Sequence, residues 1–207
     1  MIAALLFAAG AVSNALPPPP PEYARPSKEA ARHMALFAQC VTRGQPAKVR
    51  ALMATAPDSA ESNAIQQALA RSRGGCLMTG GRLTANDAAM RAAFAKQIYL
   101  VDYPTPLSAA PAAAGTGPAV AGGEGWSYAA SYADCLTAAD PVAADAWLHA
   151  LRDKAAEART REALAPAMIR CVGPGQRLRL SQDILHGLVA ERLYRLRSGG
   201  APAVAHN

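Results

Sequence analysis

The strongest constraint on this chain is an internal repeat, because its second half matches the first at a constant offset of 95 residues. Cys135 follows Cys40, and Cys171 follows Cys76, at that offset, so both cysteine pairs enclose an interval of 36 residues. A fixed period of this kind indicates two copies of one structural unit. Identical residues also recur at the paired positions Thr42 and Thr137, Pro46 and Pro141, Asp58 and Asp153, Leu69 and Leu164, Gly80 and Gly175, Arg82 and Arg177, Leu83 and Leu178, and Tyr99 and Tyr194.

The composition favours helices as the content of each unit. The chain has 207 residues, enough for one ordinary domain or two small ones. It is rich in alanine, the strongest helix former, and only 5% of its residues are aromatic, which is atypical of a β-sandwich. We predict an all-α protein made of two tandem homologous units of about four helices each.

Start signals place the helices within each copy. The first helix of the first copy is expected over about residues 27 to 42, where Leu36, Phe37 and Val41 have helical spacing. Asp58 with Glu61 three residues later resembles a capping box. Proline suits the first helical position, and Asp, Thr or Ser suits the N-cap. The later helices are therefore expected to start at or just after Pro46, Asp58 and Thr84, and at or just after Pro141, Asp153 and Ser181.

Composition also divides the chain into segments. Residues 1–15 are an apolar run ending in small residues, as in a signal peptide, and are too short to span a membrane. Prolines make residues 16–26 an extended tether. Residues 104–125 are rich in Pro, Ala and Gly and lack periodic large apolar residues, which indicates a linker. The units are then 27–103 and 126–197, followed by a disordered tail over 198–207.

Four cysteines in an exported chain are expected to form two disulfides, because export leads to an oxidising compartment. Three pairings are possible, and the sequence alone does not exclude a bond between units. Duplication of a unit that folded by itself favours Cys40 with Cys76 and Cys135 with Cys171. Closing a 36-residue interval contributes roughly 3.8 kcal/mol in the chain-entropy model, a large share of the stability of so small a core.

No constellation of catalytic, cofactor-binding or metal-binding residues stands out, so none is predicted. The histidines His33, His149, His186 and His206 have no metal-ligand spacing, and Arg91 occupies the position equivalent to His186. The sequence contains no nucleophile elbow, zinc-protease helix or phosphate loop. An enzyme built from dispersed residues remains open, as does a redox sensor, which would need exposed cysteines of low pKa.

Four repeated residues form a weak candidate contact surface: Arg82, Tyr99, Arg177 and Tyr194. The alternative is that the tyrosines anchor the last helices and the arginines cap or cover them. The net charge is +6, and the excess of basic groups lies in the first copy. A solvated face explains this charge best, and an anionic polymer is the alternative partner. Nucleic acid is not expected as a partner, because the basic residues are not interleaved with aromatics.

One arrangement of residues resembles a group of exported proteins. It consists of A-x-C-[VL]-T, then a proline, a second cysteine, a glycine, and a last helix ending A-E-R-L-Y at residues 190–194. This arrangement is similar to uncharacterised exported bacterial proteins with a duplicated cysteine-containing helical unit. The resemblance implies export and duplication and supplies no activity. In the first copy Lys96 replaces the acid found at Glu191.

These observations favour a non-catalytic exported protein, periplasmic or extracellular, that serves in interaction or as a scaffold. Its partner would be an envelope component, either a protein or an anionic polymer, and its mature chain would not span a membrane. The two units would form a pseudo-dimer or two beads on a linker. The alternative is a hydrolase of an envelope polymer with a cleft between the units.

Overall fold

The protein is described by a computed structural model over residues 28–57, 59–71, 75–76, 87–111, 126–173, 178 and 180–199. Helices dominate this part of the chain, and it holds no strand. Each half contributes four α-helices, which confirms the predicted all-α class and the two tandem units. The first half contains α1 (Lys28–Gly44), α2 (Pro46–Ala54), α3 (Ala60–Arg71) and α4 (Asp87–Asp102), and the second contains α5 (Trp126–Ala139), α6 (Pro141–His149), η2 (Ala150–Arg152), α7 (Lys154–Arg170) and α8 (Gln182–Arg197).

Side-chain caps explain where several helices begin. Asp153 accepts hydrogen bonds from the backbone N–H groups of Ala155 and Ala156, and Ser181 accepts one from Ile184, as the sequence predicted for α7 and α8. In the first half Ser59 accepts from the backbone of Ser62, at the start of α3. The expected caps Asp58 and Thr84 lie outside the described residues.

Each half has its own apolar core, built from residues at equivalent positions of the repeat. Phe37 and Leu69 are buried in the first core, and their counterparts Tyr132 and Leu164 are buried in the second. Among the described residues, Trp147 is the largest fully buried side chain, and it lies in the second core. The halves therefore share one packing scheme.

Both predicted disulfides are present. Cys40 on α1 bonds to Cys76, with an S–S distance of 2.10 Å, and Cys135 on α5 bonds to Cys171, with an S–S distance of 2.06 Å. Each cystine therefore ties the first helix of its half to the segment after the third. Because all four cysteines are in cystines, the thiols that a redox sensor would need are absent.

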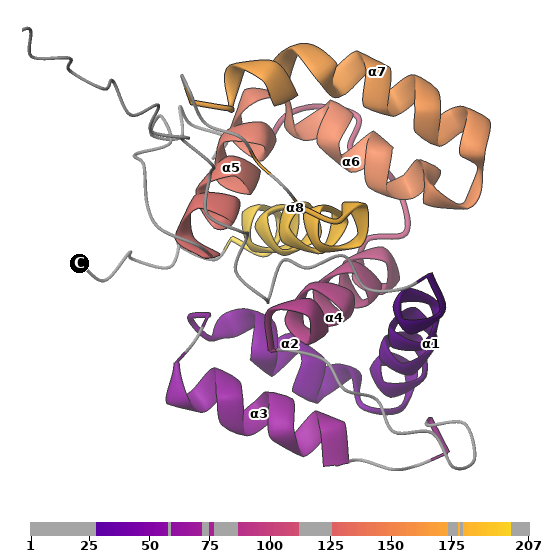
Figure 1. The fold of residues 1–207 in the computed structure, drawn as a ribbon, viewed down its shortest axis with the longest axis vertical. Helices are drawn as coiled ribbons and strands as arrows, with labels where there is room; N and C mark the ends of the chain where they lie inside the picture. The colour runs from indigo at the N-terminus through magenta and orange to yellow at the C-terminus, as the bar shows by residue number, and fades with distance from the viewer. Residues whose placement is uncertain are drawn as a thin grey trace, which may run out of the picture.

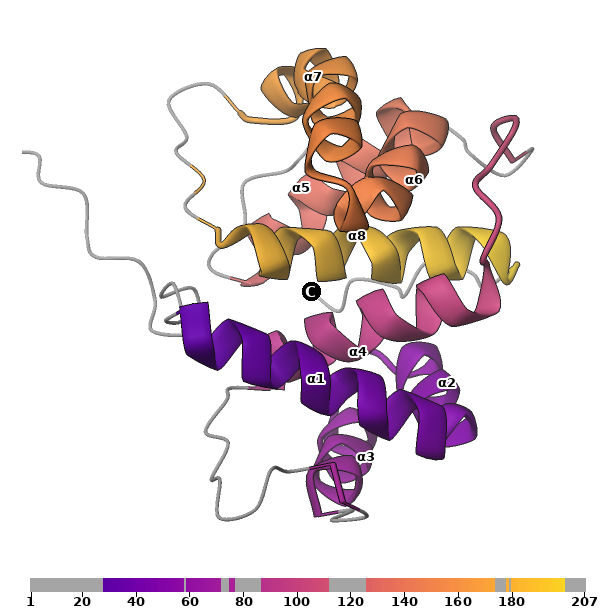
Figure 2. The same cartoon turned by 90° about the vertical axis from the view of Figure 1, so that its right-hand side faces the viewer.

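The two halves pack against each other through their last helices, α4 and α8, which lie side by side at the middle of the molecule (Figures 1 and 2). Gly187 on α8 lies directly on the backbone of Ala92 on α4, and these two residues are equivalent in the repeat. Contact between equivalent residues is characteristic of an isologous dimer interface. Of the two expected arrangements, the structure is therefore the pseudo-dimer.

Gly187→Ala is expected to destabilise the protein by about 1–3 kcal/mol in urea unfolding, because the α4–α8 contact has no room for a methyl group. An added Cβ would lie 2.3 Å from the carbonyl oxygen of Ala92. Alanine normally stabilises a helix interior relative to glycine by about 1 kcal/mol, so the expected sign reverses the usual one. Gly44→Ala on α1 is the control, since its Cβ would meet nothing within 4 Å. Equal stability of the two variants would contradict this account.

The first residues of the predicted linker, directly after α4, contact the second half. Tyr103 and Leu107 pack against the core of the second half, and the backbone N–H of Leu107 donates to the carboxylate of Asp145. Arg197 donates to the carbonyl oxygen of Thr105 over 3.3 Å. Residues 103–107 therefore help to hold the halves together. Residues 112–125 of the expected linker lie outside the described residues, as do the expected signal peptide, the tether and the tail beyond residue 199.

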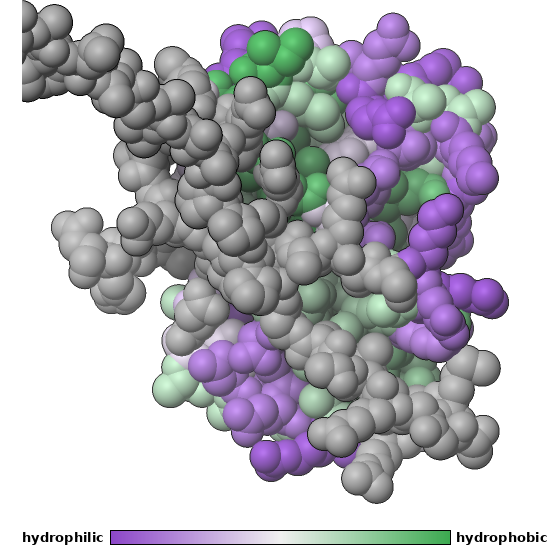
Figure 3. Space-filling model, in the orientation of Figure 1, coloured by the Kyte–Doolittle hydropathy of each residue, from purple (hydrophilic) through white to green (hydrophobic). Residues whose placement is uncertain are grey.

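The surface is mostly polar over the outer helices. Hydrophilic residues alternate with small apolar ones on the outer side of α7 (Figure 3), where Arg159 and Glu162 are exposed. Ile169, near the end of α7, is an exception, with 75% of its surface exposed. Among the described residues, no helix has the length and apolar character required to cross a lipid bilayer.

Candidate functional site

A buried ion pair joins the two halves where α4 meets α8. The guanidinium of Arg91 donates two hydrogen bonds to the carboxylate of Glu191, each over 3.0 Å. The two side chains are only 2% and 3% exposed. Arg91 also donates to the hydroxyl of Ser62 over 2.8 Å and to the carbonyl oxygen of Thr55 over 2.8 Å. Its donors therefore connect α3 and the end of α2 to the opposite half.

The buried acid has a second arginine partner on its own helix. Arg195, one turn after Glu191 on α8, donates to the same carboxylate and to the carbonyl oxygen of Thr55. Burial by itself would raise the pKa of Glu191, but the charges of Arg91, Arg195 and Arg192 together hold it below its ordinary value. Glu191 is therefore a stable buried anion.

Two tyrosines connect the halves in a reciprocal way. Tyr99 on α4 donates its hydroxyl to Asp145 on α6, and Arg197 on α8 donates to that hydroxyl over 3.2 Å. In the opposite direction, Tyr194 on α8 donates to Asp102 on α4 over 3.0 Å. Each tyrosine thus extends from the last helix of its own half to an acid in the other half.

The acids that accept these tyrosine hydroxyls each form an ion pair with an arginine, and the acid and the arginine exchange positions between the two halves. Arg50 on α2 forms a two-pronged pair with Asp102 on α4, over 2.7 and 2.9 Å. At the equivalent positions of the second half, Asp145 on α6 faces Arg197 on α8 at 3.7 Å. The hydrogen bonds that Arg50 donates to the carboxylate of Asp102 raise the pKa of Arg50. Burial, followed by the hydrogen bond that Tyr194 donates to Asp102, raises the pKa of Tyr194 to about 12.

Of the four residues of the predicted contact surface, the structure describes Tyr99 and Tyr194. Tyr99 is fully buried, and Tyr194 is partly buried with its hydroxyl bonded across the interface. Both tyrosines therefore anchor the last helices, which is the alternative described above, and Tyr99 offers no surface to an external partner. Arg82 and Arg177 lie outside the described residues.

Sequence reasoning missed the charged residues that hold the interface. Comparison of the copies for identity passes over them, because the repeat sets Arg50 against Asp145, Asp102 against Arg197, and Lys96 against Glu191. The inversion of charge at these three pairs of equivalent positions was the sequence signal that could have indicated an interface between the copies. Such inversion is expected where a charged partner on one helix must match a charged partner on another.

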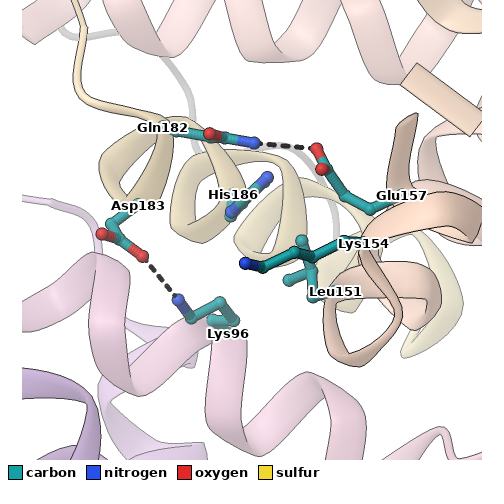
Figure 4. A pocket seen from close by; sticks show the side chains of 7 residues that line it. All are labelled: Lys96, Leu151, Lys154, Glu157, Gln182, Asp183 and His186. Carbon is teal, nitrogen blue, oxygen red and sulfur yellow. Dashed lines mark hydrogen bonds and ion pairs between the residues drawn. The ribbon is translucent and has the colours of Figure 1, made fainter. Parts of the chain in front are cut away.

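A pocket of about 240 Å³ lies at the edge of this interface, between α4, α7 and α8 (Figure 4). Lys96 pairs with Asp183 over 3.1 Å on one side, and Gln182 donates to Glu157 over 2.8 Å on the other. Lys154 points into the space between these pairs in Figure 4. The lining residues are Lys96, Leu151, Lys154, Glu157, Gln182, Asp183 and His186.

The imidazole of His186 lies between this pocket and the second core. The residue is 4% exposed, its ring packs edge-on against Trp147 at 4.4 Å between centroids, and its Nε2 has no hydrogen-bond partner among the described residues. Burial, followed by the charge of Lys96, lowers the pKa of His186 to about 3. At neutral pH the ring is therefore an uncharged group with an unused polar atom.

His186 is expected to remain uncharged from about pH 5 to 8, in contrast to an unperturbed histidine. The unfolded chain would take up this proton near a pKa of about 6.5, so the folded state should lose stability as the pH falls through that value. Imidazole ¹⁵N shifts of the labelled protein would measure the titration. His186→Asn should weaken the fall in stability between pH 7 and 5. A His186 midpoint between about pH 6 and 7 would contradict the burial argument.

The chemistry of the pocket beside His186 suits binding. Its acids and cations are mostly paired with each other, and Lys154 and the Nε2 of His186 are the polar groups that have no protein partner among the described residues. The described part of the chain also holds no group of three or more His, Cys, Asp or Glu side chains that could hold a metal ion. No protein-family model, curated protein or solved structure matches this chain.

Proposed function

We propose that this chain is an exported, non-catalytic interaction protein of the cell envelope. The observation that carries the proposal is that the contact face between the halves is packed along α4 and α8, and that the pocket at its edge has a volume of only about 240 Å³. Arg91 with Glu191, the two tyrosines, and the close contact of Gly187 with Ala92 all lie along α4 and α8. A polymer hydrolase with its cleft between the units would need open space at that face.

The polar residues of the interface support the same proposal. A catalytic acid or base must be free to exchange its proton with a substrate, whereas Glu191 is fully engaged with Arg91 and Arg195. The two cystines and this network make a stiff body with preformed surfaces, and such a body loses little conformational freedom on binding. Stiffness of this kind favours recognition of a partner.

Export is supported by two independent features. Intramolecular disulfides persist in oxidising compartments, and both cysteine pairs form them here. The apolar run over residues 1–15 is typical of a secretory signal. Together they favour the periplasm or the extracellular space as the site of action.

Co-sedimentation with a bacterial envelope fraction would test the function. The oxidised full-length protein should sediment with the insoluble envelope, and the supernatant should gain no soluble saccharide or peptide fragments during incubation. Protein that is reduced and unfolded before mixing is the control for non-specific capture. Release of fragments would establish the hydrolase instead, and absence of sedimentation above the control would refute the interaction function.

A further inference from the structure

The pocket beside His186 has an equivalent in the first half that is already filled. The repeat places His186, Glu157 and Lys96 at the positions of Arg91, Ser62 and Glu191. In the first half the long side chain of Arg91 fills this position and bonds to both Ser62 and Glu191. In the second half the shorter imidazole leaves a pocket of about 240 Å³. The pocket therefore corresponds to the space that the Arg91 side chain fills in the first half, and no described side chain of the second half fills it.

The charge on the wall of this pocket is reversed relative to the first half. Glu191 accepts a cation in the first half, whereas Lys96 stands at the equivalent position in the second. A group that takes the place of the Arg91 guanidinium here should therefore carry negative charge. Simple attraction between opposite charges determines this sign.

The acids near the pocket do not oppose a single negative charge. Glu157 accepts from the indole N–H of Trp147 over 3.2 Å and from Gln182 over 2.8 Å, and it also faces Arg161 at 3.5 Å. Asp183 is paired with Lys96. Lys154 has no ion-pair partner among the described residues. The lining residues include two cations and two acids, and Arg161, which faces Glu157 from outside the pocket, gives the wider cluster one more cation than acid. A monoanion would balance it, whereas a dianion such as phosphate would exceed it.

The Nε2 of His186 is a donor beside this pocket that has no partner among the described residues and almost no accessible surface, so a small rotation of the ring is needed for it to reach a ligand. A buried polar atom without a partner is unfavourable, and a ligand that reaches it relieves this cost. Because the ring is uncharged at neutral pH, it can place its single proton on Nε2 and donate to an oxyanion. Leu151 gives the same pocket an apolar wall, which suits a short carbon stem.

We propose that this pocket binds a monocarboxylate with a short apolar stem, held by the charges of Lys154 and Lys96 and by a hydrogen bond from the Nε2 of His186. The proposal rests on the binding function given above and names the chemistry that one site of that function recognises. The carboxylate can be that of a free organic acid or the end group of a peptide, since the pocket would contact the same atoms in both.

The test is an NMR titration of the oxidised full-length protein at neutral pH and low salt. Propionate and acetyl-dialanine are the two carboxylate probes, and propionamide is the uncharged control of matched shape. The signals of the His186 imidazole and the Trp147 indole should shift and saturate with at least one carboxylate probe and should not respond to propionamide. Saturation by propionate identifies a free-acid site, and saturation by acetyl-dialanine alone identifies a peptide-end site.

Variants decide whether the pocket is responsible. Lys154→Gln should raise the dissociation constant of the responding probe about tenfold, because it removes the unpaired cation. Lys48→Gln, at an exposed lysine on α2 of the other half, should leave the constant unchanged. His186→Gln retains a donor near the ring position and should bind more tightly than His186→Leu, provided that both variants melt as the parent does. An equal response to propionamide, no saturation by either carboxylate, or full affinity in Lys154→Gln would overturn the proposal.

The two proposals can fail separately. If the protein sediments with the envelope but neither carboxylate probe binds, the carboxylate site is refuted and the interaction function stands. If a carboxylate binds at this pocket but the protein does not sediment, the envelope function is refuted and the site stands.

Discussion

Replacing Glu191 with alanine is expected to destabilise the folded protein by about 3–5 kcal/mol, because it leaves the buried guanidinium of Arg91 without its counter-charge. Both side chains are almost completely buried, so water cannot substitute for the lost carboxylate. Arg195 would lose its partner at the same time, which adds to the effect. Urea unfolding followed by far-ultraviolet circular dichroism would measure the change.

Matched variants separate the cost of an unpaired charge from the value of the pair. The double variant Arg91→Met with Glu191→Leu removes both charges of the pair and should recover part of the loss, since apolar replacements of buried pairs are commonly neutral or stabilising. Recovery should be incomplete, because Arg195 still lacks its carboxylate partner. Asp183→Ala breaks the more exposed pair with Lys96 and should cost about 0–1 kcal/mol. If Glu191→Ala costs no more than Asp183→Ala, the pair does not hold the interface.

The same pair gives stability a dependence on acid pH. The folded state holds the pKa of Glu191 below its ordinary value of 4.5, so the stabilisation is fully present above that value. It should be lost as the pH falls through the lowered folded-state pKa, because the carboxylate then takes up a proton. The double variant without these charges should show a shallower loss of stability in acid.

Removal of either cystine is expected to lower the free energy of unfolding by about 3–4 kcal/mol, in proportion to the chain freedom restored to the unfolded state. Cys40→Ser with Cys76→Ser opens one loop, and Cys135→Ser with Cys171→Ser opens the other. Because both loops close an equal interval of 36 residues, the two losses should be similar. Thermal melts and urea titrations of the oxidised variants would compare them.

Reduction of the parent protein provides the control for the serine substitutions. Dithiothreitol should lower the melting temperature of the parent and leave a variant lacking all four cysteines unchanged. Because the interface network links the halves, loss of one cystine should destabilise the entire molecule in a single transition. An unchanged melting temperature after complete reduction would show that the cystines contribute little to stability.

The sequence was sufficient for the features that the repeat preserves. Apolar residues such as Leu69 and Leu164, and the paired cysteines, recur because each half must bury its own core and close its own loop. Helix starts at Asp153 and Ser181 were predictable because capping depends on local hydrogen bonds. Local and duplicated constraints are therefore the ones that a single sequence reveals.

Contacts between the halves could not be predicted in the same way. The partners of Arg91 are 29, 36 and 100 residues away in the chain, and the ion pair has no identical counterpart in the second half. Leu107 lies in the predicted linker over 104–125, a segment without periodic large apolar residues, yet it packs against the second core. Its position depends on the tertiary arrangement of α6 and α8, which the local composition does not encode.

The contact of Gly187 with Ala92 makes the two faces complementary and different from each other. Two first halves meeting through α4 would bring one Ala92 methyl group into the space of another, and would set the Arg91 of one against the Lys96 of the other. The first half is thus built to reject a copy of itself and to accept the second. If two molecules exchanged halves, every contact between the halves would still be formed. The covalent connection between the halves opposes such domain swapping, because it keeps the matching half of the same molecule at a high local concentration.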